Sequence, residues 1–258
     1  MSNDGADDDV ELSEQSFISH LVELRARLLK AVAAVLVVLL ALIPSANRIY
    51  QFIAEPLLER LPADAKMIAI DVASPFFTPL RLAFFVALFV AMPVVLFQLW
   101  RFVAPGLYRH EKRLALPLLA SSVALFYAGC AFAYWFVLPN VFRFLLGMTP
   151  EGVAMTTDIG RYLDFVLTMF LAFGLCFEIP VAVVIIASLG WVTPAQLSAN
   201  RPYVIFGVFV VAAIVAPPDV VSMIMLAIPM CLLYELGVVA TRLLERQAPG
   251  STAGNIRV

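Results

Sequence analysis

One acidic residue, Glu178, lies within a long apolar stretch, in the sequence FLAFGLCFEIP at residues 170–180. A carboxyl group in a membrane-spanning segment costs on the order of several kcal/mol unless it is protonated or has a partner, so such a residue indicates a functional site. Its partner could be a polar residue of an adjoining protein or the groups of a proton pathway. Alternatively, Glu178 is a neutral acid that bonds a backbone carbonyl freed by Pro180. Glu235, near the end of the last apolar segment, could simply reach the aqueous face or pair with Arg242.

Glu23 lies on the polar side of a predicted amphipathic helix. Apolar residues recur at helical spacing on one face, which comprises Phe17, Leu21, Leu24 and Leu28. The opposite face is polar and comprises Ser16, His20, Glu23, Arg27 and Lys30. A helix of this kind lies at a membrane interface. On residue types alone, the simplest interpretation of Glu23 is an ion pair with Arg27, one turn further along and in the favourable order.

Glu111 is the single acid in the basic segment YRHEKR at residues 108–113. Two interpretations are open. The segment could anchor the chain at the positively charged side of a membrane, with Glu111 relieving repulsion among its neighbours. It could equally offer a carboxylate, kept ionised by the adjacent positive charges, to a cationic ligand.

Residues for catalysis are lacking. The only histidines, His20 and His110, both lie at the predicted cytoplasmic face and form no evident nucleophile–base pair, and no glycine-rich phosphate loop is present. The cysteines, Cys130, Cys176 and Cys231, lie in apolar runs without metal-ligand spacing. The sequence therefore predicts neither an enzyme nor a bound metal or cofactor.

The composition indicates where these acids must be placed. Of the 258 residues, 62% are hydrophobic and 14% are charged, against about 45–50% and about 25% in soluble domains. Residues 114–142 contain no Asp, Glu, Lys or Arg, and an uncharged run of that length predicts a membrane helix. A soluble enzyme, a secreted disulfide-rich domain and a nucleic-acid-binding protein are excluded.

Six apolar segments predict an all-α polytopic membrane protein with six transmembrane helices, at residues 28–46, 77–103, 117–142, 162–189, 203–216 and 220–241. Several contain proline, and we expect these helices to be kinked rather than interrupted. Residues 1–12 are predicted to be a disordered acidic N-terminus, residues 13–245 a single six-helix domain, and residues 246–258 a disordered cytoplasmic tail.

The last two segments are short. Residues 203–216 would span only about 21 Å as a helix, whereas the hydrocarbon core of a bilayer is about 30 Å thick. We predict two short helices joined by an outer turn at residues 216–219. The alternative is one long helix kinked there, which would leave Arg242 and Arg246 on the wrong side for the charge rule.

The orientation follows from basic residues near the ends of the spans, which favour the cytoplasmic side. The segments that flank the spans on one predicted side of the membrane contain the larger set of basic residues: Arg25, Arg27, Lys30, Arg101, Arg109, Lys112, Arg113, Arg201, Arg242, Arg246 and Arg257. The segments on the opposite side contain the smaller set: Arg48, Arg60, Lys66, Arg81, Arg143 and Arg161. Both termini are therefore predicted to be cytoplasmic, with residues 47–76 forming a structured outer cap.

Six short motifs occur in order along the chain: HLVELR at residues 20–25, SPFFTP at 74–79, YRHEKR at 108–113, FEIP at 177–180, RPY at 201–203 and PPD at 217–219. With the six-span hydropathy, they make residues 17–245 closely resemble the TatC family, the multispanning core subunit of the twin-arginine protein translocase. The resemblance implies a cupped six-helix bundle in the bacterial cytoplasmic (inner) membrane, with two short C-terminal helices.

The resemblance also implies a function and partners. A TatC subunit binds the Arg-Arg signal peptides of folded cargo at its cytoplasmic face. It pairs with the single-span TatB in a multi-copy complex and recruits TatA for export driven by the proton-motive force. By motif position, Glu23 and Glu111 match the carboxylates that hold the twin arginines, and Arg25 and Phe102 match residues around the same patch.

The remaining matched positions lie elsewhere in the bundle. Glu178 matches the intramembrane acid thought to face the TatA or TatB helix, and Pro56 and Asp219 match functional outer-face positions. Family members often carry polar residues beside the Pro-Pro-Asp turn, where this chain has Ala216 and Met223. The polar partner site formed with Glu178 is therefore thinner here, or the partner completes it.

Two alternatives from other classes are weaker. A small secondary transporter would use Glu178 as a proton relay, but internal symmetry and paired discontinuous helices would be expected of it, and the sequence shows neither. A membrane scaffold without a ligand does not account for two acids in a basic cytoplasmic face.

Overall fold

The computed structural model describes residues 4–51, 68–70, 72–107, 115–148, 158–215 and 220–247. Within these ranges the chain is helical throughout, apart from turns and an isolated bridge between Ile68 and Asp158. The helices in order are α1 (Asp4–Leu42), η1 (Ile43–Ser45), α3 (Ser74–Leu107), α4 (Ala115–Phe132), η3 (Ala133–Val137), α5 (Leu138–Gly147), α6 (Ile159–Cys176), α7 (Ile179–Ser188), α8 (Pro194–Ala199), α9 (Arg201–Val215) and α10 (Val220–Gln247). The all-α prediction is confirmed.

Helical stretches of membrane-crossing length match five of the predicted spans. They are Ser19–Gln51, Ser74–Phe102, Leu116–Phe144, Ile159–Ser188 and Val220–Leu244. The remaining apolar helix, α9, has 15 residues and is about 22 Å long at 1.5 Å per residue. A helix of this length is too short to cross an unperturbed bilayer core of about 30 Å, so a total of six spans stays a prediction.

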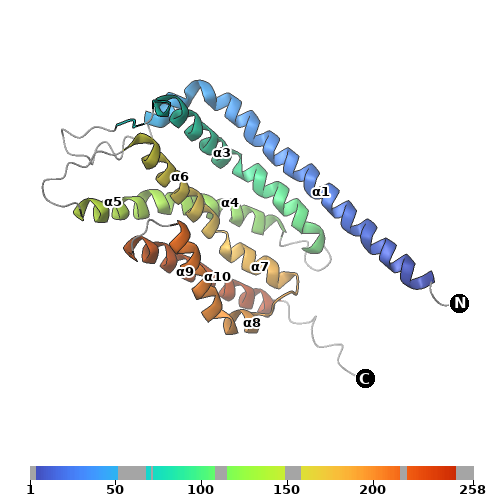
Figure 1. The fold of residues 1–258 in the computed structure, drawn as a ribbon. Helices are drawn as coiled ribbons and strands as arrows, with labels where there is room; N and C mark the ends of the chain where they lie inside the picture. The colour runs from blue at the N-terminus through green and yellow to red at the C-terminus, as the bar shows by residue number, and fades with distance from the viewer. Residues whose placement is uncertain are drawn as a thin grey trace.

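The helices are arranged from one edge of the bundle to the other (Figure 1). The blue helix α1 lies along α3 at one edge, the red and orange helices α9 and α10 form the opposite edge, and α4 and α6 lie between them. Val35 of α1 packs against Ala87 and Ala91 of α3, small residues that allow the two helices to approach closely. The bundle has two ends. We call the end that carries Glu23 of α1, together with the short helix α8, the Glu23 end. We call the end that carries Asp158, where α6 begins, the Asp158 end.

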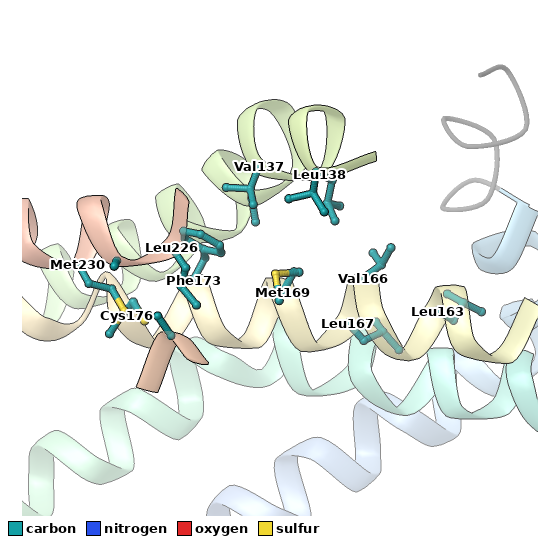
Figure 2. Packing of buried hydrophobic residues seen from close by; sticks show 14 of the residues in the cluster. Val137, Leu138, Leu163, Val166, Leu167, Met169, Phe173, Cys176, Leu226 and Met230 are labelled. Carbon is teal, nitrogen blue, oxygen red and sulfur yellow. The ribbon is translucent and has the colours of Figure 1, made fainter. Parts of the chain in front are cut away.

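The main core surrounds α6. Figure 2 shows Leu167, Met169 and Phe173 on this helix, with Val137 facing it from η3 and Leu226 coming from α10. Phe173 is fully buried. At the Asp158 end, the Asp158 carboxylate caps α6 by accepting from the backbone N–H of Arg161 at 3.2 Å. The cap and the core together fix α6 as the centre of the bundle.

Two glycines bring α4 and α6 together. A Cβ atom at Gly129 would lie 2.4 Å from the backbone oxygen of Phe173, and one at Gly174 would lie 2.6 Å from the ring of Phe126. Both distances are shorter than real Cβ contacts, so only glycine permits this approach. The two glycines lie on facing sides of one contact and fix how α4 and α6 lie against each other.

This close approach predicts the effect of a methyl group. Gly129→Ala should lower the free energy of unfolding by about 1–3 kcal/mol, because the backbone of Phe173 must move. Gly207→Ala is the matched control, since nothing lies within 4 Å of a Cβ there, and it should be neutral or stabilising by up to about 1 kcal/mol. Denaturant titration of the purified protein in detergent measures both. Equal changes in the two variants would show that the glycine contact does not hold α4 on α6.

The prediction that proline does not interrupt the spans is right at three positions and wrong at Pro180. α3 continues through Pro93, residues 115–147 stay helical through Pro139, and α10 continues through Pro229. At Pro180, however, Phe177 and Glu178 form a turn that separates α6 from α7. Pro180 lies in the first turn of α7, where its missing N–H would have had no partner within the helix, so a helix can begin here at no cost in hydrogen bonds. Glu178 is therefore at a helix junction and not in a continuous helix.

The chain ends differ from the prediction in extent. Helix α1 begins at Asp4, so part of the predicted disordered segment, residues 1–12, is helical in the structure. No proline interrupts residues 4–42, which allows the helix to continue toward the N-terminus. Helix α10 continues to Gln247, and residues 248–258 of the predicted tail lie outside the described residues.

Candidate functional site

Glu23 is paired with Arg27 on the same helix. Arg27 Nε donates to Glu23 Oε1 at 2.9 Å, and Arg27 Nη2 donates to the same oxygen. The side chains of Arg27 and Glu23 are 16% and 34% exposed, respectively. The pair expected from the sequence is thus present, and within the described ranges no donor reaches the second oxygen, Oε2.

The start of the first span contacts the end of the second span beside this pair. The rings of His20 and Phe102 are stacked, with centroids 4.2 Å apart and planes 21° from parallel. His20, Glu23 and Arg27 are spaced by three and four residues and share one face of α1. The structure therefore places Glu23 and Phe102 at the same end of the bundle. Arg25 is exposed, and Glu111 lies outside the described residues.

His20 is a member of this patch that sequence reasoning did not assign to the site. Its spacing from Glu23 was the available signal, because residues three apart on a helix are neighbours. What the sequence could not show was that the ring of Phe102, more than 80 residues away in α3, stacks on His20. The stacked rings form a flat, partly exposed surface next to a carboxylate, an arrangement that suits a planar cation.

Glu178 has a partner in another span. Ser122 Oγ of α4 donates to Glu178 Oε2 at 2.5 Å. Ser122 is 1% exposed and Glu178 is half-buried. The other carboxyl oxygen, Oε1, is buried, and none of the described groups donates to it. The partners expected from the sequence were an adjoining protein, a proton pathway or a freed carbonyl, and a serine of the same chain was not among them.

The other predicted site residues are only partly described. Met223 of α10 is half-buried and packs against the main core cluster, whereas the Glu178 carboxyl turns toward α4. Pro56, Ala216 and Asp219 lie outside the described residues. The structure therefore does not bring Met223 and Glu178 into a shared polar cluster.

Two ion pairs between distant helices were not predicted. At the Asp158 end, Arg81 Nη1 of α3 lies 2.6 and 2.8 Å from the two carboxyl oxygens of Asp164 in α6. Toward the Glu23 end, Arg201 Nη2 of α9 donates to Glu235 Oε2 of α10 at 2.6 Å. The sequence left two possibilities open for Glu235, and the structure pairs it with Arg201 and not with Arg242.

Arg242 bonds a residue of α8. Its Nη2 donates to Ser198 Oγ at 2.5 Å. Thr193 and Gln196 form a capping box at the start of α8, which satisfies backbone donors at the beginning of this short helix. Tyr234 of α10 also bonds it, donating its hydroxyl to the Leu197 carbonyl at 2.8 Å.

The arrangement suits binding more than bond-making chemistry. The part of the chain that the structure describes holds no group of three metal-ligating side chains. What it offers is a carboxylate beside stacked rings at one end, and a buried carboxyl with one unbonded oxygen between α4 and α7. The first can accept a cation with N–H donors, and the second can accept a hydrogen bond inside a membrane.

Comparison with protein families gives a match over most of the chain. The family described as "Sec-independent protein translocase protein (TatC)" matches residues 19–229. A TatC protein of Azotobacter chroococcum is 54% identical over 242 residues, covering 93% of this chain and 95% of the relative. The TatC protein of Escherichia coli K12 is 52% identical over 228 residues, covering 88% of each.

Comparison with solved structures agrees. A crystal structure of the twin-arginine translocase receptor TatC superposes with a TM-score of 0.78 at 38% sequence identity. The match covers 88% of this chain and 100% of the other. A crystal structure of the same receptor in the detergent DDM gives the same TM-score at 37% identity. The similarity is therefore one of whole folds and not of a single motif.

Proposed function

Because this chain belongs to the TatC family of Sec-independent protein translocases, we propose that its Glu23 end binds the twin-arginine signal peptides of folded cargo proteins. As a family member, the chain is a membrane component of the Tat translocase, a transport protein and not an enzyme. The proposal concerns which part of the molecule carries out recognition, and with which residues.

The observation that supports this site is the second carboxyl oxygen of Glu23, to which no described residue donates. Arg27 bonds Oε1 alone, so Oε2 can accept a guanidinium from a second chain without displacing Arg27. The stacked rings of His20 and Phe102 lie beside it. A guanidinium is planar, carries its donors in a fixed fork and stacks on aromatic faces. A lysine ammonium is a compact point charge without this planar fork. This chemistry favours arginine.

A second carboxylate is needed for a pair of arginines. Glu111 belongs to the basic segment that joins α3 to α4, and α3 ends at Leu107. We assign the second arginine to Glu111, with Arg25 and Phe102 bordering the patch. The positive neighbours of Glu111 keep it ionised.

The test compares two signal peptides that differ only in the paired residues. A photo-crosslinking amino acid at Phe102, in the complete translocase in native membranes, should capture an Arg-Arg peptide at least tenfold more efficiently than its Lys-Lys counterpart. The same probe at Trp191, which is 75% exposed and follows α7, serves as the control position. Equal capture of both peptides at Phe102 would contradict the proposed site.

The intramembrane acid is assigned a different role. Glu178 contacts the membrane helix of a TatA-like or TatB-like subunit in a multi-copy complex, and export is driven by the proton-motive force. Ala216 and Met223, which match the family's polar positions beside the Pro-Pro-Asp turn, are assigned to the same contact, and Pro56 and Asp219 act at the outer face. The support for this role is a buried carboxyl oxygen to which no donor is offered by the described part of the chain.

The orientation places recognition in the cytoplasm. The excess of basic residues puts both termini on the cytoplasmic side of the bacterial inner membrane. In a variant lacking the three native cysteines, Asp64→Cys should react with an impermeant thiol reagent in intact cells. Ser251→Cys should react only after the cells are opened. Labelling of Ser251→Cys from outside would reverse the assignment.

A further inference from the structure

Two adjacent serines of α4 have different partners. Ser121 Oγ donates to the Leu118 carbonyl of its own helix at 2.8 Å, as serines within helices commonly do. Ser122 Oγ instead donates to Glu178 Oε2, 56 residues away, at 2.5 Å. Ser122 is 1% exposed, so its hydroxyl has no contact with lipid or water. The tertiary structure therefore gives these two adjacent serines different hydrogen-bond partners.

The position of Ser122 relative to Glu178 is fixed by packing. Ser122, Phe126 and Gly129 follow one another on a single buried face of α4. Further along this face, after Ser122 in the sequence, Phe126 lies against Gly174 and Gly129 lies against the backbone of Phe173. Neither contact leaves space for sliding, so α4 is held in register with α6. The hydroxyl therefore stays opposite the junction where α6 ends.

The helix break places Glu178 at that junction. Glu178 precedes the first residue of α7, and its backbone carbonyl accepts the N–H of Ala182 at 2.9 Å. Its Oε1 is buried and has no donor from any described residue. An unbonded carboxyl oxygen in an apolar setting is costly, so a donor from outside the chain would stabilise it. Because the side chain is half-buried and its terminal torsion is broad, a small rotation can present this oxygen to a neighbour.

We propose that Ser122 is a positioning residue for Glu178: its hydroxyl holds one carboxyl oxygen inside the bundle and thereby leaves the other for an N–H or O–H donor on a partner subunit's membrane helix. This rests on the proposed function, in which Glu178 contacts such a helix. Without the Ser122 hydroxyl, the carboxyl loses its only bond from the described residues and is free to adopt several orientations. The partner then meets a carboxyl that is no longer aligned for it.

The experiment uses the complete translocase in native membranes, with a photo-crosslinking residue at Leu175. This residue is 54% exposed and lies one turn before Glu178. Ser122→Ala should reduce crosslinking to the single-span partner by about three- to twentyfold, the range expected for a hydrogen bond between membrane helices. Ser121→Ala is the matched control and should change the yield by less than about twofold. Capture of the Arg-Arg peptide from Phe102 should be unchanged in both variants, because that site lies at the Glu23 end.

Each other outcome has a distinct meaning. If Glu178→Ala abolishes the partner crosslink while Ser122→Ala leaves it intact, Ser122 has no positioning role and the proposed contact at Glu178 stands. If Glu178→Ala also leaves the crosslink intact, the proposed contact itself is wrong, and the role of Ser122 fails with it. Equal losses in Ser121→Ala and Ser122→Ala, or loss of peptide capture in Ser122→Ala, would overturn the inference in favour of a general packing effect.

Discussion

Replacement of Glu111 by Gln is expected to weaken binding of an Arg-Arg signal peptide by about tenfold or more, and replacement of both Glu23 and Glu111 by about a hundredfold or more. A hydrogen bond to a charged group contributes about 1.5–3 kcal/mol, and each 1.4 kcal/mol is about a factor of ten in affinity. Glutamine keeps the shape of the side chain and removes its charge. Titration of a labelled signal peptide against membranes containing the complete translocase measures the change.

Arg27→Gln distinguishes a binding carboxylate from a merely structural one. In the structure Arg27 is the partner of Glu23. If Glu23 serves only this pair, Glu23→Gln and Arg27→Gln should give equally mild defects. If Glu23 binds the peptide, Glu23→Gln should weaken binding while Arg27→Gln should not, because the carboxylate is still present. Assembly with the TatB-like partner should persist in all three variants. Unchanged peptide affinity in Glu111→Gln would show that the motif match reports the fold and not the binding site.

Glu178→Ala is expected to remove crosslinks to the partner helix and to abolish most export, whereas Glu178→Gln should retain much of both. Glutamine still offers an oxygen to the Ser122 hydroxyl and lacks only the ability to titrate. Alanine offers no polar group at all, so the partner would place its donor in an apolar site without an acceptor. Export of a folded reporter protein and crosslinking from Leu175 are the two measurements.

The same pair of variants separates contact from proton transfer. A proton relay needs a group that gains and loses a proton, and glutamine cannot do so. Complete loss of export in Glu178→Gln, with partner crosslinks intact, would therefore favour a relay at Glu178 over a helix contact. Retained export in that variant would exclude an obligatory proton step at this residue.

The existence of the apolar spans could be predicted from the sequence because it depends on local properties, although the last one, predicted to be short, is the 28-residue helix α10. Inside a bilayer the backbone hydrogen bonds of each helix are satisfied within that helix, so an apolar stretch of sufficient length forms a span wherever it packs. The predicted segment at residues 117–142 and the observed Leu116–Phe144 agree for this reason. The Glu23–Arg27 pair was also predictable, since its members are one helical turn apart.

The interruption at Glu178 required more than local pattern. Pro93 and Pro229 are tolerated inside continuous helices, whereas Pro180 accompanies a break. All three remove the same backbone donor. A proline is compatible with either outcome, so its presence alone does not determine where a helix ends; at the break beside Pro180, Ser122 of α4 bonds the carboxyl of Glu178.

Which polar side chains of different helices meet was decided by the tertiary structure alone. Ser122 and Glu178 are 56 residues apart, Arg81 and Asp164 83 apart, and Arg201 and Glu235 34 apart. Apolar helices can pack in many ways with similar burial, and lipid is as apolar as their side chains. In this chain the close approach at Gly129 and Gly174 fixes how α4 lies on α6. That steric contact, which no hydropathy pattern contains, determines that the carboxyl of Glu178 faces a serine hydroxyl.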